Sequence, residues 1–432
     1  MAGDVYTELA WRGMVYEGTE GVRDALSKER VTCYIGFDPT APSLHVGSLL
    51  PMMVLARLQR FGHRPIAIVG GGTGLIGDPS GRTQERQLLA AEQVEENAAG
   101  IRAQLARVLD FGARDNPAAI VNNADWLTKL DLMDFLRDVG KHFTVNYLLA
   151  KESVKRRLDS EDGISYTEFS YLLLQAYDFL MMFDRYQCTL QLGGSDQWGN
   201  IVAGCDLIRK LRGGRAHGLV LPLVTTTSGV KFGKTEAGAL WLDPARTAPY
   251  EFYQFWINTD DRDVGRYLKY FTFLEEAEIA ALEAEHARAP ERRTAQRRLA
   301  SEVTVLVHGE EAARGAEEES GRRFGGGTAA DRIRALVESG SEPAIELRAT
   351  ELGPRPLVRI LTTTGLATSA SEAARLIRAG AVRVNDERVT DERKQFGSED
   401  THEGLLLVAR GGRRVCAVKL VFPGAEVRPE GA

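Results

Sequence analysis

VTCYIGFDPTAPSLHVGSLLPMMVLARLQRFG, residues 31–62, decides the fold of this chain. Its first seven residues are apolar and rich in β-branched side chains, which predicts a buried strand. The turn DPTAPS follows, and its Ser43 is expected to cap a helix that runs to Gly62. Free N–H groups and the helix dipole would point at this turn, which predicts an anion site. His45 would offer ring N–H donors there, and Gly47 would leave room for a ligand.

Further strands and helices alternate along the first half of the chain. Apolar runs predict strands in RPIAIVGG (64–71), at 120–122 and in YQCTLQLGG (186–194). Helical spacing of apolar residues predicts helices near 84–111, 125–137, 165–182 and 201–211, besides one or two amphipathic helices in the first 30 residues. Strands that alternate with helices indicate an α/β fold, a Rossmann-like domain with a parallel sheet and right-handed crossovers.

The length of 432 residues predicts two or three domains. We expect a Rossmann-like catalytic domain at 1–245, an α-helical domain at 246–325, a Gly-rich linker at 326–353 and a small α+β module at 354–432. The net charge is −6 for the whole chain, yet the stretch 354–420 holds 12 basic and 8 acidic residues. This asymmetry indicates an acidic body with a basic C-terminal module.

Cysteine usage and hydropathy limit the location of the protein. The four cysteines are far apart and form no CxxC pair, so neither a disulfide framework nor a zinc site is expected, and we predict no bound metal. The N-terminus lacks the pattern of a signal peptide, and no apolar run reaches the ~18 residues of a membrane span. A cytoplasmic location is the expectation.

Two Gly-rich loops resemble nucleotide motifs only in part. GTGLIG at 72–77 matches a dinucleotide fingerprint, which requires a helix to open there, whereas Pro79 disfavours one. GVKFGKT at 229–235 is a near miss for a phosphate loop, because Ser228 stands where that motif needs Gly. Lys231 and Lys234 would nevertheless suit a polyphosphate. A solvated surface turn is an equally good interpretation of KFGKT alone.

The motifs taken together resemble the class I aminoacyl-tRNA synthetases. HVGS (45–48) takes the place of the family's HIGH motif, and KFGKT (231–235) takes the place of KMSKS. Ser48 departs from the final His, and Thr235 replaces a Ser. Tyr34, GLIGDPSG (74–81), YLLLQAYDF (171–179) and GGSDQWGN (193–200) resemble the bacterial type of tyrosyl-tRNA synthetases, and the resemblance covers nearly the whole chain.

The resemblance implies a tyrosine–tRNA ligase that joins tyrosine to ATP, releases pyrophosphate and transfers tyrosine to tRNA-Tyr. Such chemistry needs positioning and charge stabilisation rather than a protein nucleophile. His45 would donate to the phosphate with Thr40 as its partner, and Lys231, Lys234, Arg82 and Arg86 would close on pyrophosphate. For Arg82 and Arg86, a solvated helix start is the alternative. Magnesium would accompany ATP as substrate, and no organic cofactor is implied.

The resemblance also assigns the substrate pocket. Tyr34 and Asp178 would contact the phenol, and Asp78, Tyr171 and Gln175 the ammonium group. Tyr171, Gln175 and Asp178 fall on one helix face by their spacing. Rejecting phenylalanine needs buried polar groups, an effect for which the tyrosyl enzymes themselves are the established example. The resemblance assigns further residues to the tyrosine and adenylate region: Gly36, Asp38, Gly47, Gly194, Asp196, Gln197, Lys231, Lys234 and Thr235. Asp196 could alternatively cap a helix beginning near Trp198.

The C-terminal sequence TSASEAARLIRAGAVRVNDERVTDERKQ (368–395) resembles an S4 RNA-binding domain. It predicts a helix capped by Ser371, followed by a short strand. Four basic residues could follow a phosphate backbone: Arg375, Arg378, Arg383 and Lys394. Aromatic residues are scarce here, which favours contacts to the shape and phosphates of a structured RNA over base stacking.

The family works as a homodimer in the cytoplasm with L-tyrosine, ATP and tRNA-Tyr as partners, and no membrane is expected. Two alternatives stay open from the sequence. One is a tryptophan–tRNA ligase, which Asp178 and the S4-like module disfavour. The other is a non-catalytic RNA-binding protein on a synthetase scaffold, which the presence of His45, Lys231 and Lys234 disfavours.

Overall fold

A computed structural model describes residues 4–80, 89–159, 163–227, 232–235, 238–324, 333, 345–348, 354–402, 404–411 and 414–421. Contacts between residues divide the chain into two units. The N-terminal unit extends through Gly309, and the C-terminal unit begins at Glu310. Within the described residues, no helix is both long and apolar enough to span a membrane.

The N-terminal unit is built on one twisted sheet with the strand order β1-β6-β5-β2-β3-β4. Its parallel strands are β2 (Thr32–Phe37), β3 (Arg64–Val69), β4 (Ala119–Asn122), β5 (Cys188–Gly194) and β6 (His217–Leu221). The short β1 (Glu17–Gly18) joins β6 antiparallel at one edge. The α/β fold with a Rossmann-like sheet is thus confirmed.

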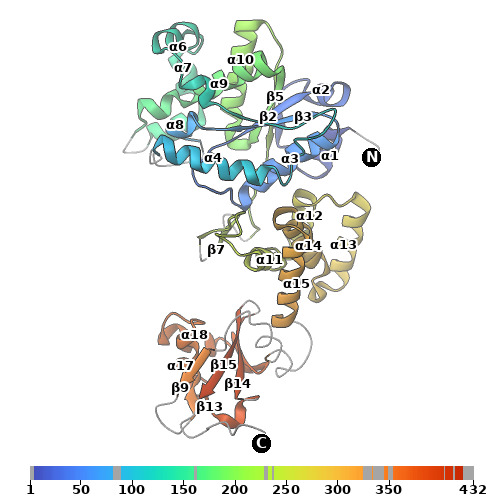
Figure 1. Ribbon diagram of the computed structural model, residues 1–432, viewed down its shortest axis with the longest axis vertical. Helices are drawn as coiled ribbons and strands as arrows, with labels where there is room; N and C mark the ends of the chain where they lie inside the picture. Colours follow the sequence, from blue (N-terminus) through green and yellow to red (C-terminus); the bar gives the residue numbers. More distant parts are fainter. Residues whose placement is uncertain are drawn as a thin grey trace, which may run out of the picture. The chain divides into compact units, whose positions relative to one another are not determined.

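Helices cover both faces of this sheet. Figure 1 shows α3 (Leu49–Arg60) and α4 (Ala91–Leu105) over one face, and α9 (Tyr166–Tyr186) and α10 (Trp198–Arg212) over the other. α9 is the longest of these helices; Ser165 caps its N-terminus by accepting the Glu168 N–H at 3.2 Å, and apolar residues bury one side of it. Its Phe179 and Ala176 pack with Tyr34 of β2 in a core that α10 completes.

Shorter elements complete the sheet domain. The N-terminal helices are α1 (Val5–Trp11) and α2 (Val22–Lys28). Between β4 and α9 lie α5 (Ala124–Leu127), α6 (Leu132–Asp138), α7 (Val145–Leu149) and α8 (Glu152–Leu158). The predicted helix at 125–137 is therefore two helices. The predicted helix at 84–111 is described only as α4, and residues 81–88 lie outside the described part of the chain.

The turn after β2 differs from the prediction in one respect. His45, not Ser43, caps the short 3₁₀ turn η1 (Val46–Ser48) that leads into α3, and its Nδ1 accepts the Gly47 N–H at 3.0 Å. Ser43 is buried instead, and its hydroxyl accepts from Gln104 Nε2 at 2.8 Å and from Asp243 N at 3.2 Å. Ser43 thus links the turn to a later segment rather than to its own helix.

The dinucleotide-like GTGLIG loop opens no long helix. It forms only the 3₁₀ turn η2 (Thr73–Leu75), and residues 77–79, which include Gly77 with a φ of +90°, belong to no helix or strand. A nicotinamide site of the Rossmann type requires a helix N-terminus at this point. The described residues 72–80 contain no such helix, so they do not have the geometry that this fingerprint requires.

Four helices close the N-terminal unit: α11 (Pro249–Ile257), α12 (Val264–Phe271), α13 (Glu276–Arg288) and α14 (Thr294–His308). They follow a small hairpin of β7 (Lys234–Thr235) and β8 (Gly238–Ala239). Phe252 and Trp256 of α11 are fully buried and lie among aromatic neighbours.

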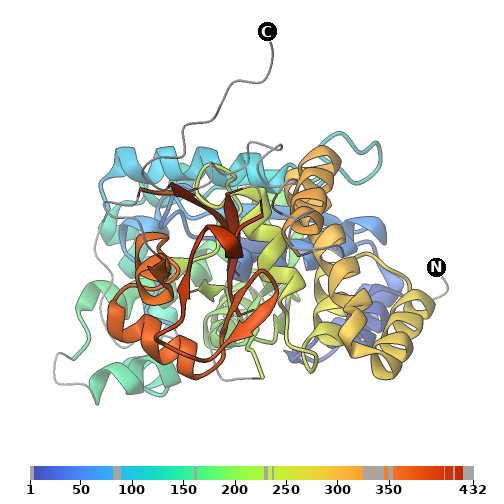
Figure 2. The same ribbon diagram turned by 90° about the horizontal axis from the view of Figure 1, so that it is seen from below.

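The C-terminal unit contains α15 (Glu310–Phe324) and an α+β module. The module has a sheet in the order β12-β11-β14-β15-β9, with β9 (Ile345–Arg348), β11 (Val382–Val384), β12 (Glu387–Val389), β14 (Leu405–Arg410) and β15 (Arg414–Val421). A second pair joins β10 (Arg355–Pro356) and β13 (Gln395–Phe396). In Figure 2 the orange helices α17 (Leu357–Thr363) and α18 (Ala370–Arg378) lie beside these strands.

The N-cap of α18 lies two residues earlier than predicted. Ser369, not Ser371, accepts the Glu372 N–H at 3.2 Å, and Thr368 donates back to the Glu372 carboxylate. The two serines are two residues apart, so the sequence signal fitted either one. The helix itself, and the strand that follows Gly380, agree with the prediction.

Candidate active site

The site lies where the chain changes direction across the sheet. From β2 the crossovers lead outward to β3 and β4, whereas β5 and β6 lie on the other side of β2. The carboxyl ends of β2 and β5 therefore border a crevice, the place where open α/β sheets bind ligands. Gly36 and Asp38 lie at the end of β2, and Gly194 and Asp196 at the end of β5. Gly36 is exposed and faces open space.

Asp178 of α9 is the most unusual ionisable group at this crevice. It is 4% exposed, and its two oxygens accept from Asn123 Nδ2 at 2.8 Å and from Trp126 Nε1 at 2.7 Å. Burial raises the pKa of Asp178 to about 7, against the opposing effect of these hydrogen bonds. A buried carboxylate held by two neutral donors is ready to accept a further hydrogen bond.

Two buried polar atoms on the central strands β2 and β5 have no partner among the described residues. They are the hydroxyl of Tyr34 and Oε1 of Gln191, whose residues are each 2% exposed. Tyr34 and Gln191 are paired in register on β2 and β5, so both side chains project from the same face. Burial and the nearby Asp178 charge raise the pKa of Tyr34 well above its ordinary value. Orphaned buried polar atoms indicate a ligand with matching polar groups.

A second polar group lies around Asp78. Gln197 Nε2 donates to Asp78 Oδ2 at 2.7 Å, and Asn200 Nδ2 donates to Gln175 Oε1 at 2.9 Å and to Gln197 Oε1 at 3.2 Å. The structure therefore brings Asp78, Gln175 and Gln197 together from three distant stretches of sequence. Tyr171 is buried on α9, one turn before Gln175. This cluster contains carbonyl and carboxylate oxygens, the acceptors that suit an ammonium group.

His45 is exposed at the start of η1, and its tautomer follows from its hydrogen bond. Because Nδ1 accepts from Gly47 N, the proton of the neutral ring is on Nε2, which can donate outward. A side chain at residue 47 would press on the His45 ring, which explains the glycine there. The ring lies edge-on to Trp241, with centroids 6.4 Å apart.

One short segment joins the two motifs that the sequence predicted to cooperate. Leu240 N donates to Gly233 O at 3.0 Å, and Leu240 O accepts from Val46 N at 2.9 Å. Leu242 N donates to Leu44 O at 2.9 Å, which extends the same ladder. Gly233 has a φ of +76°, and a Cβ there would clash with Val46. The HVGS and KFGKT motifs are therefore neighbours.

The structure does not describe the side chains of several predicted site residues. Arg82, Arg86 and Lys231 lie outside the described residues, and only the backbone of Lys234 and Thr235 is described. Thr40 is exposed, and its N–H donates to Asp38 O at 2.9 Å. Asp196 lies in the 3₁₀ turn η4 (Ser195–Gln197), whereas Gln197 is the N-cap of α10, so the interpretation of Asp196 as that helix's cap is wrong.

Sequence reasoning missed three residues of the site: Asn123, Trp126 and Asn200. Asn123 and Trp126 follow the carboxyl end of β4, where polar side chains of a parallel sheet face the ligand crevice. That placement could have identified Asn123. The local sequence does not indicate that Trp126 donates a hydrogen bond to Asp178 of α9, because only the fold brings these two residues together.

The predicted RNA-binding residues lie in the C-terminal unit. The side chains of Arg375, Arg378, Arg383 and Lys394 are all exposed. Arg378 forms an exposed ion pair with Glu392 at 3.5 Å. Such a pair is weak, so a phosphate group could take the place of Glu392.

The sequence of this chain is similar to those of known proteins over nearly its whole length. Residues 26–325 match the model of the tRNA synthetases class I (W and Y), and residues 355–402 match the S4 domain. The sequence is 57% identical to a tyrosine–tRNA ligase of Roseiflexus castenholzii over 95% of this chain and 97% of that protein. It is 55% identical to a tyrosine–tRNA ligase of Geobacillus kaustophilus, with 95% and 98% covered.

The fold is similar to that of a solved structure as well. A C-terminally truncated mitochondrial tyrosyl-tRNA synthetase of Aspergillus nidulans superimposes with a TM-score of 0.67 at 34% identity. The match covers 73% of this chain and 93% of that one.

The burial of Asp178 predicts a measurable pH dependence. Its pKa is raised in the folded chain, so between about pH 4 and pH 7 the native state holds a proton that the unfolded state has lost. This group therefore lowers the free energy of unfolding as the pH rises through that window. We expect Asp178→Asn to remove this contribution, measured by urea unfolding from pH 4.5 to pH 8.

Asp125→Asn, at an exposed position on α5, is the matched control and should follow the wild-type pH profile. If the Asp178→Asn profile ran parallel to that of the wild type, Asp178 would not be the buried titrating group.

Proposed function

The chain belongs to the class I tRNA synthetases for tryptophan and tyrosine, and from this premise we propose that it is an ATP-dependent tyrosine–tRNA ligase. It activates L-tyrosine with ATP and then transfers the tyrosine to tRNA-Tyr. The observation that carries the substrate assignment is the buried Tyr34 hydroxyl, which lacks a partner among the described residues and lies beside Asp178.

The proposed tyrosine site uses both polar clusters of the crevice. The phenol hydroxyl donates to Asp178 and accepts from Tyr34, so that both buried groups are satisfied. Phenylalanine would leave them unpaired, which costs binding free energy. The ammonium group of tyrosine is held by Asp78, Tyr171 and Gln175, with Gln197 fixed in place by its bond to Asp78. The carboxylate is left pointing toward the HVGS turn.

The proposed activation step is a displacement at the α-phosphate of ATP, which enters with its magnesium as substrate. A carboxylate oxygen of tyrosine forms a bond to this phosphorus while the bond to pyrophosphate breaks. His45 Nε2–H donates to the phosphate as charge develops, with Thr40 beside it, and no protein nucleophile takes part. Lys231, Lys234, Arg82 and Arg86 are proposed to hold the departing pyrophosphate.

Remaining contacts to the nucleotide are assigned by position. Gly36 and Gly47 leave space at the end of β2 and at the turn, and Asp38 and Asp196 provide oxygens for ribose hydroxyl groups. Gly194 permits the close approach of Asp196, since a Cβ there would meet its carboxylate. Thr235 is proposed to contribute its hydroxyl to the nucleotide site. In the second step a terminal ribose hydroxyl of tRNA attacks the tyrosyl carbonyl and AMP leaves.

His45→Ala tests the activation step. We expect the rate of tyrosine-dependent ATP–pyrophosphate exchange to fall by about 10²–10³, because one donor to the developing charge is lost. His402→Ala, an exposed histidine of the C-terminal unit, is the control and should keep the wild-type rate.

Exchange is measured with tyrosine and with tryptophan in parallel. Exchange with tryptophan but not tyrosine would establish the alternative specificity, and wild-type tRNA binding without any exchange would establish a non-catalytic scaffold. An unchanged rate in His45→Ala would contradict the proposed mechanism while leaving the family assignment intact.

We further propose that the S4 module binds the tRNA through exposed cations. Arg375 and Arg378 lie on α18, and Arg383 on the neighbouring β11. Lys394 precedes β13 and lies over the Phe396 ring at 5.6 Å. Few aromatic rings accompany them, so phosphate contacts would provide most of the affinity.

Arg383→Ala should weaken binding of tRNA-Tyr and reduce the slope of log K against log[salt] by about 0.7–0.9, because one phosphate contact is lost. Filter binding at salt concentrations from about 50 to about 200 mM measures both the affinity and the slope. Lys28→Ala removes one exposed cation from α2 and should leave the slope unchanged. Equal slopes for Arg383→Ala and the wild type would exclude a phosphate contact at this position.

A homodimer in the cytoplasm is the proposed working state. Cys33, Cys188 and Cys205 form no disulfide among the described residues, which suits a reducing compartment. Helices α6 and α7 expose apolar side chains that a second copy could cover: Leu132, Met133, Leu136, Val145 and Leu149. Met133 is the most exposed of them, at 69%.

Met133→Glu should convert the dimer into a monomer, because a carboxylate would be buried without a partner at the apolar surface. Sedimentation velocity at micromolar concentration measures the change. Val305→Glu, at an exposed apolar position of α14, should remain dimeric. A monomeric wild type would contradict the proposed assembly.

A further inference from the structure

Helix α12 contacts the residues that flank Lys231 on both sides. Phe232 is 6% exposed and inserts among aromatic rings of α11 and α12. It stacks on Phe271 with an interplanar angle of 3° and centroids 5.5 Å apart, and lies edge-on to Tyr267 at 5.2 Å. The second residue of the KFGKT motif is therefore fixed by packing against α12.

The residues that precede the motif are fixed by the other end of α12. The buried carboxylate of Asp263, the N-cap of α12, accepts from Thr227 N at 3.0 Å and from Thr227 Oγ1 at 2.6 Å. Arg266 Nη2 donates to Asp263 Oδ1 at 2.6 Å and to Thr225 O at 2.7 Å. Charge-assisted hydrogen bonds of this kind are stronger than neutral ones. Thr225 and Thr227 are thus tied to the start of α12.

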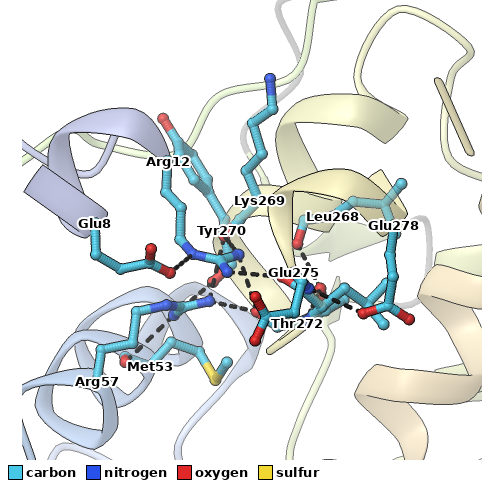
Figure 3. Close-up of polar contacts among 11 residues, drawn as sticks. Glu8, Arg12, Met53, Arg57, Leu268, Lys269, Tyr270, Thr272, Glu275 and Glu278 are labelled. Carbon is cyan, nitrogen blue, oxygen red and sulfur yellow. Dashed lines mark hydrogen bonds and ion pairs between the residues drawn. The ribbon is translucent and has the colours of Figure 1, made fainter. Parts of the chain in front are cut away.

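The C-terminal end of α12 is held by two buried arginines (Figure 3). Arg12 of α1 is 4% exposed and donates to Lys269 O at 3.0 Å, Thr272 O at 3.3 Å and Leu274 O at 2.7 Å. Arg57 of α3 is 2% exposed and donates to Thr272 O and, at 3.3 Å, to Lys269 O. The last carbonyl groups of a helix lack intrahelical donors, and cations are favoured beside them.

This arrangement connects α12 to the helix that follows the HVGS turn. Arg57 belongs to α3, which begins one residue after Ser48. Glu8 balances part of the charge by pairing with Arg12 at 2.5 Å. Burial and the neighbouring Arg12 guanidinium lower the pKa of Arg57 well below its ordinary value, so these two cations are held close together at a cost in free energy. Through its bonds to Lys269 O and Thr272 O, Arg57 links the C-terminal end of α12 to α3.

We propose that α12 positions the KFGKT segment relative to the HVGS turn, with Asp263 and Arg57 as positioning residues at its two ends. Arg57 sets α12 against α3, and Asp263 and the aromatic cluster set Thr227 and Phe232 against α12. Asp263 and Arg57 are both buried, and they hydrogen-bond to other residues of the protein. The proposal rests on the proposed function, because the KFGKT segment acts on ATP in that reaction.

A substitution at Thr227 tests the proposal with the least disturbance of the fold, because this side chain is exposed and its replacement leaves the core intact. Thr227→Val removes the hydroxyl that donates to Asp263 and keeps the β-branched shape, whereas Thr227→Ser keeps the hydroxyl. We expect Thr227→Val to lower kcat/KM for ATP in tyrosine-dependent pyrophosphate exchange by about tenfold, the effect of one charge-assisted hydrogen bond. Thr227→Ser should restore it, and the Kd for tyrosine should stay unchanged in both variants.

Arg57→Met tests the other end of α12 and should also lower kcat/KM for ATP, by about tenfold or more, because small misplacements of reacting groups are costly. Asn116→Ala is the matched control. Asn116 donates to Gln59 O at 2.6 Å and to His63 O at 2.9 Å, so its loss frees main-chain carbonyl groups at the end of the same helix α3 without touching α12. Both variants are assayed at a temperature at which circular dichroism shows them folded.

The outcomes separate this proposal from the proposed function. Absence of exchange in the wild type would overturn the proposed function itself. An active wild type with equal kcat/KM in Thr227→Val would overturn the positioning role alone. Equal losses in Thr227→Val and Thr227→Ser, or a tyrosine Kd that weakens in parallel, would overturn it too, since a structural fault rather than the Asp263 bond would then be the cause.

Discussion

The parallel pairing of β2 with β3 on one side and with β5 on the other is the constraint on which the rest of the molecule depends. Because the chain leaves β2 in one direction and returns on its opposite side, a crevice opens at the carboxyl ends of β2 and β5. Tyr34 and Gln191 face each other across this pairing, and α9 supplies Asp178 above them. A shift of β2 by one residue would turn Tyr34 to the opposite face and abolish the pocket.

Polar groups in the crevice form two clusters with different chemistry. Around Asp178 the groups are buried, and the pKa of the carboxyl is raised to about 7, so a hydrogen bond from a ligand hydroxyl is strengthened by the low local dielectric. Around Asp78 the amides of Gln175, Gln197 and Asn200 form a connected network. The distance between these clusters along α9 is one turn, which fits an amino acid with a polar group at each end.

Much of this could be predicted from the sequence, for reasons of periodicity. Alternating strands and helices predicted the sheet, and the i, i+4, i+7 spacing placed Tyr171, Gln175 and Asp178 on one face of α9. The caps were less certain, because Ser43 and Ser371 each have a competing neighbour and only tertiary contacts decide between them. The roles of Trp126, Asn200, Arg12 and Arg57 could not be predicted, since each makes a decisive hydrogen bond to a residue more than 20 positions away along the chain. Arg82, Arg86 and Lys231 remain predictions.

The position of bound L-tyrosine tests the central claim most directly. A crystal structure of the protein with L-tyrosine should place the phenol oxygen within about 3.2 Å of both Tyr34 Oη and an Asp178 oxygen, with the ammonium group beside Asp78 and Gln175. Tyrosine bound elsewhere, or bound in the crevice with the phenol directed away from Asp178, would contradict the account.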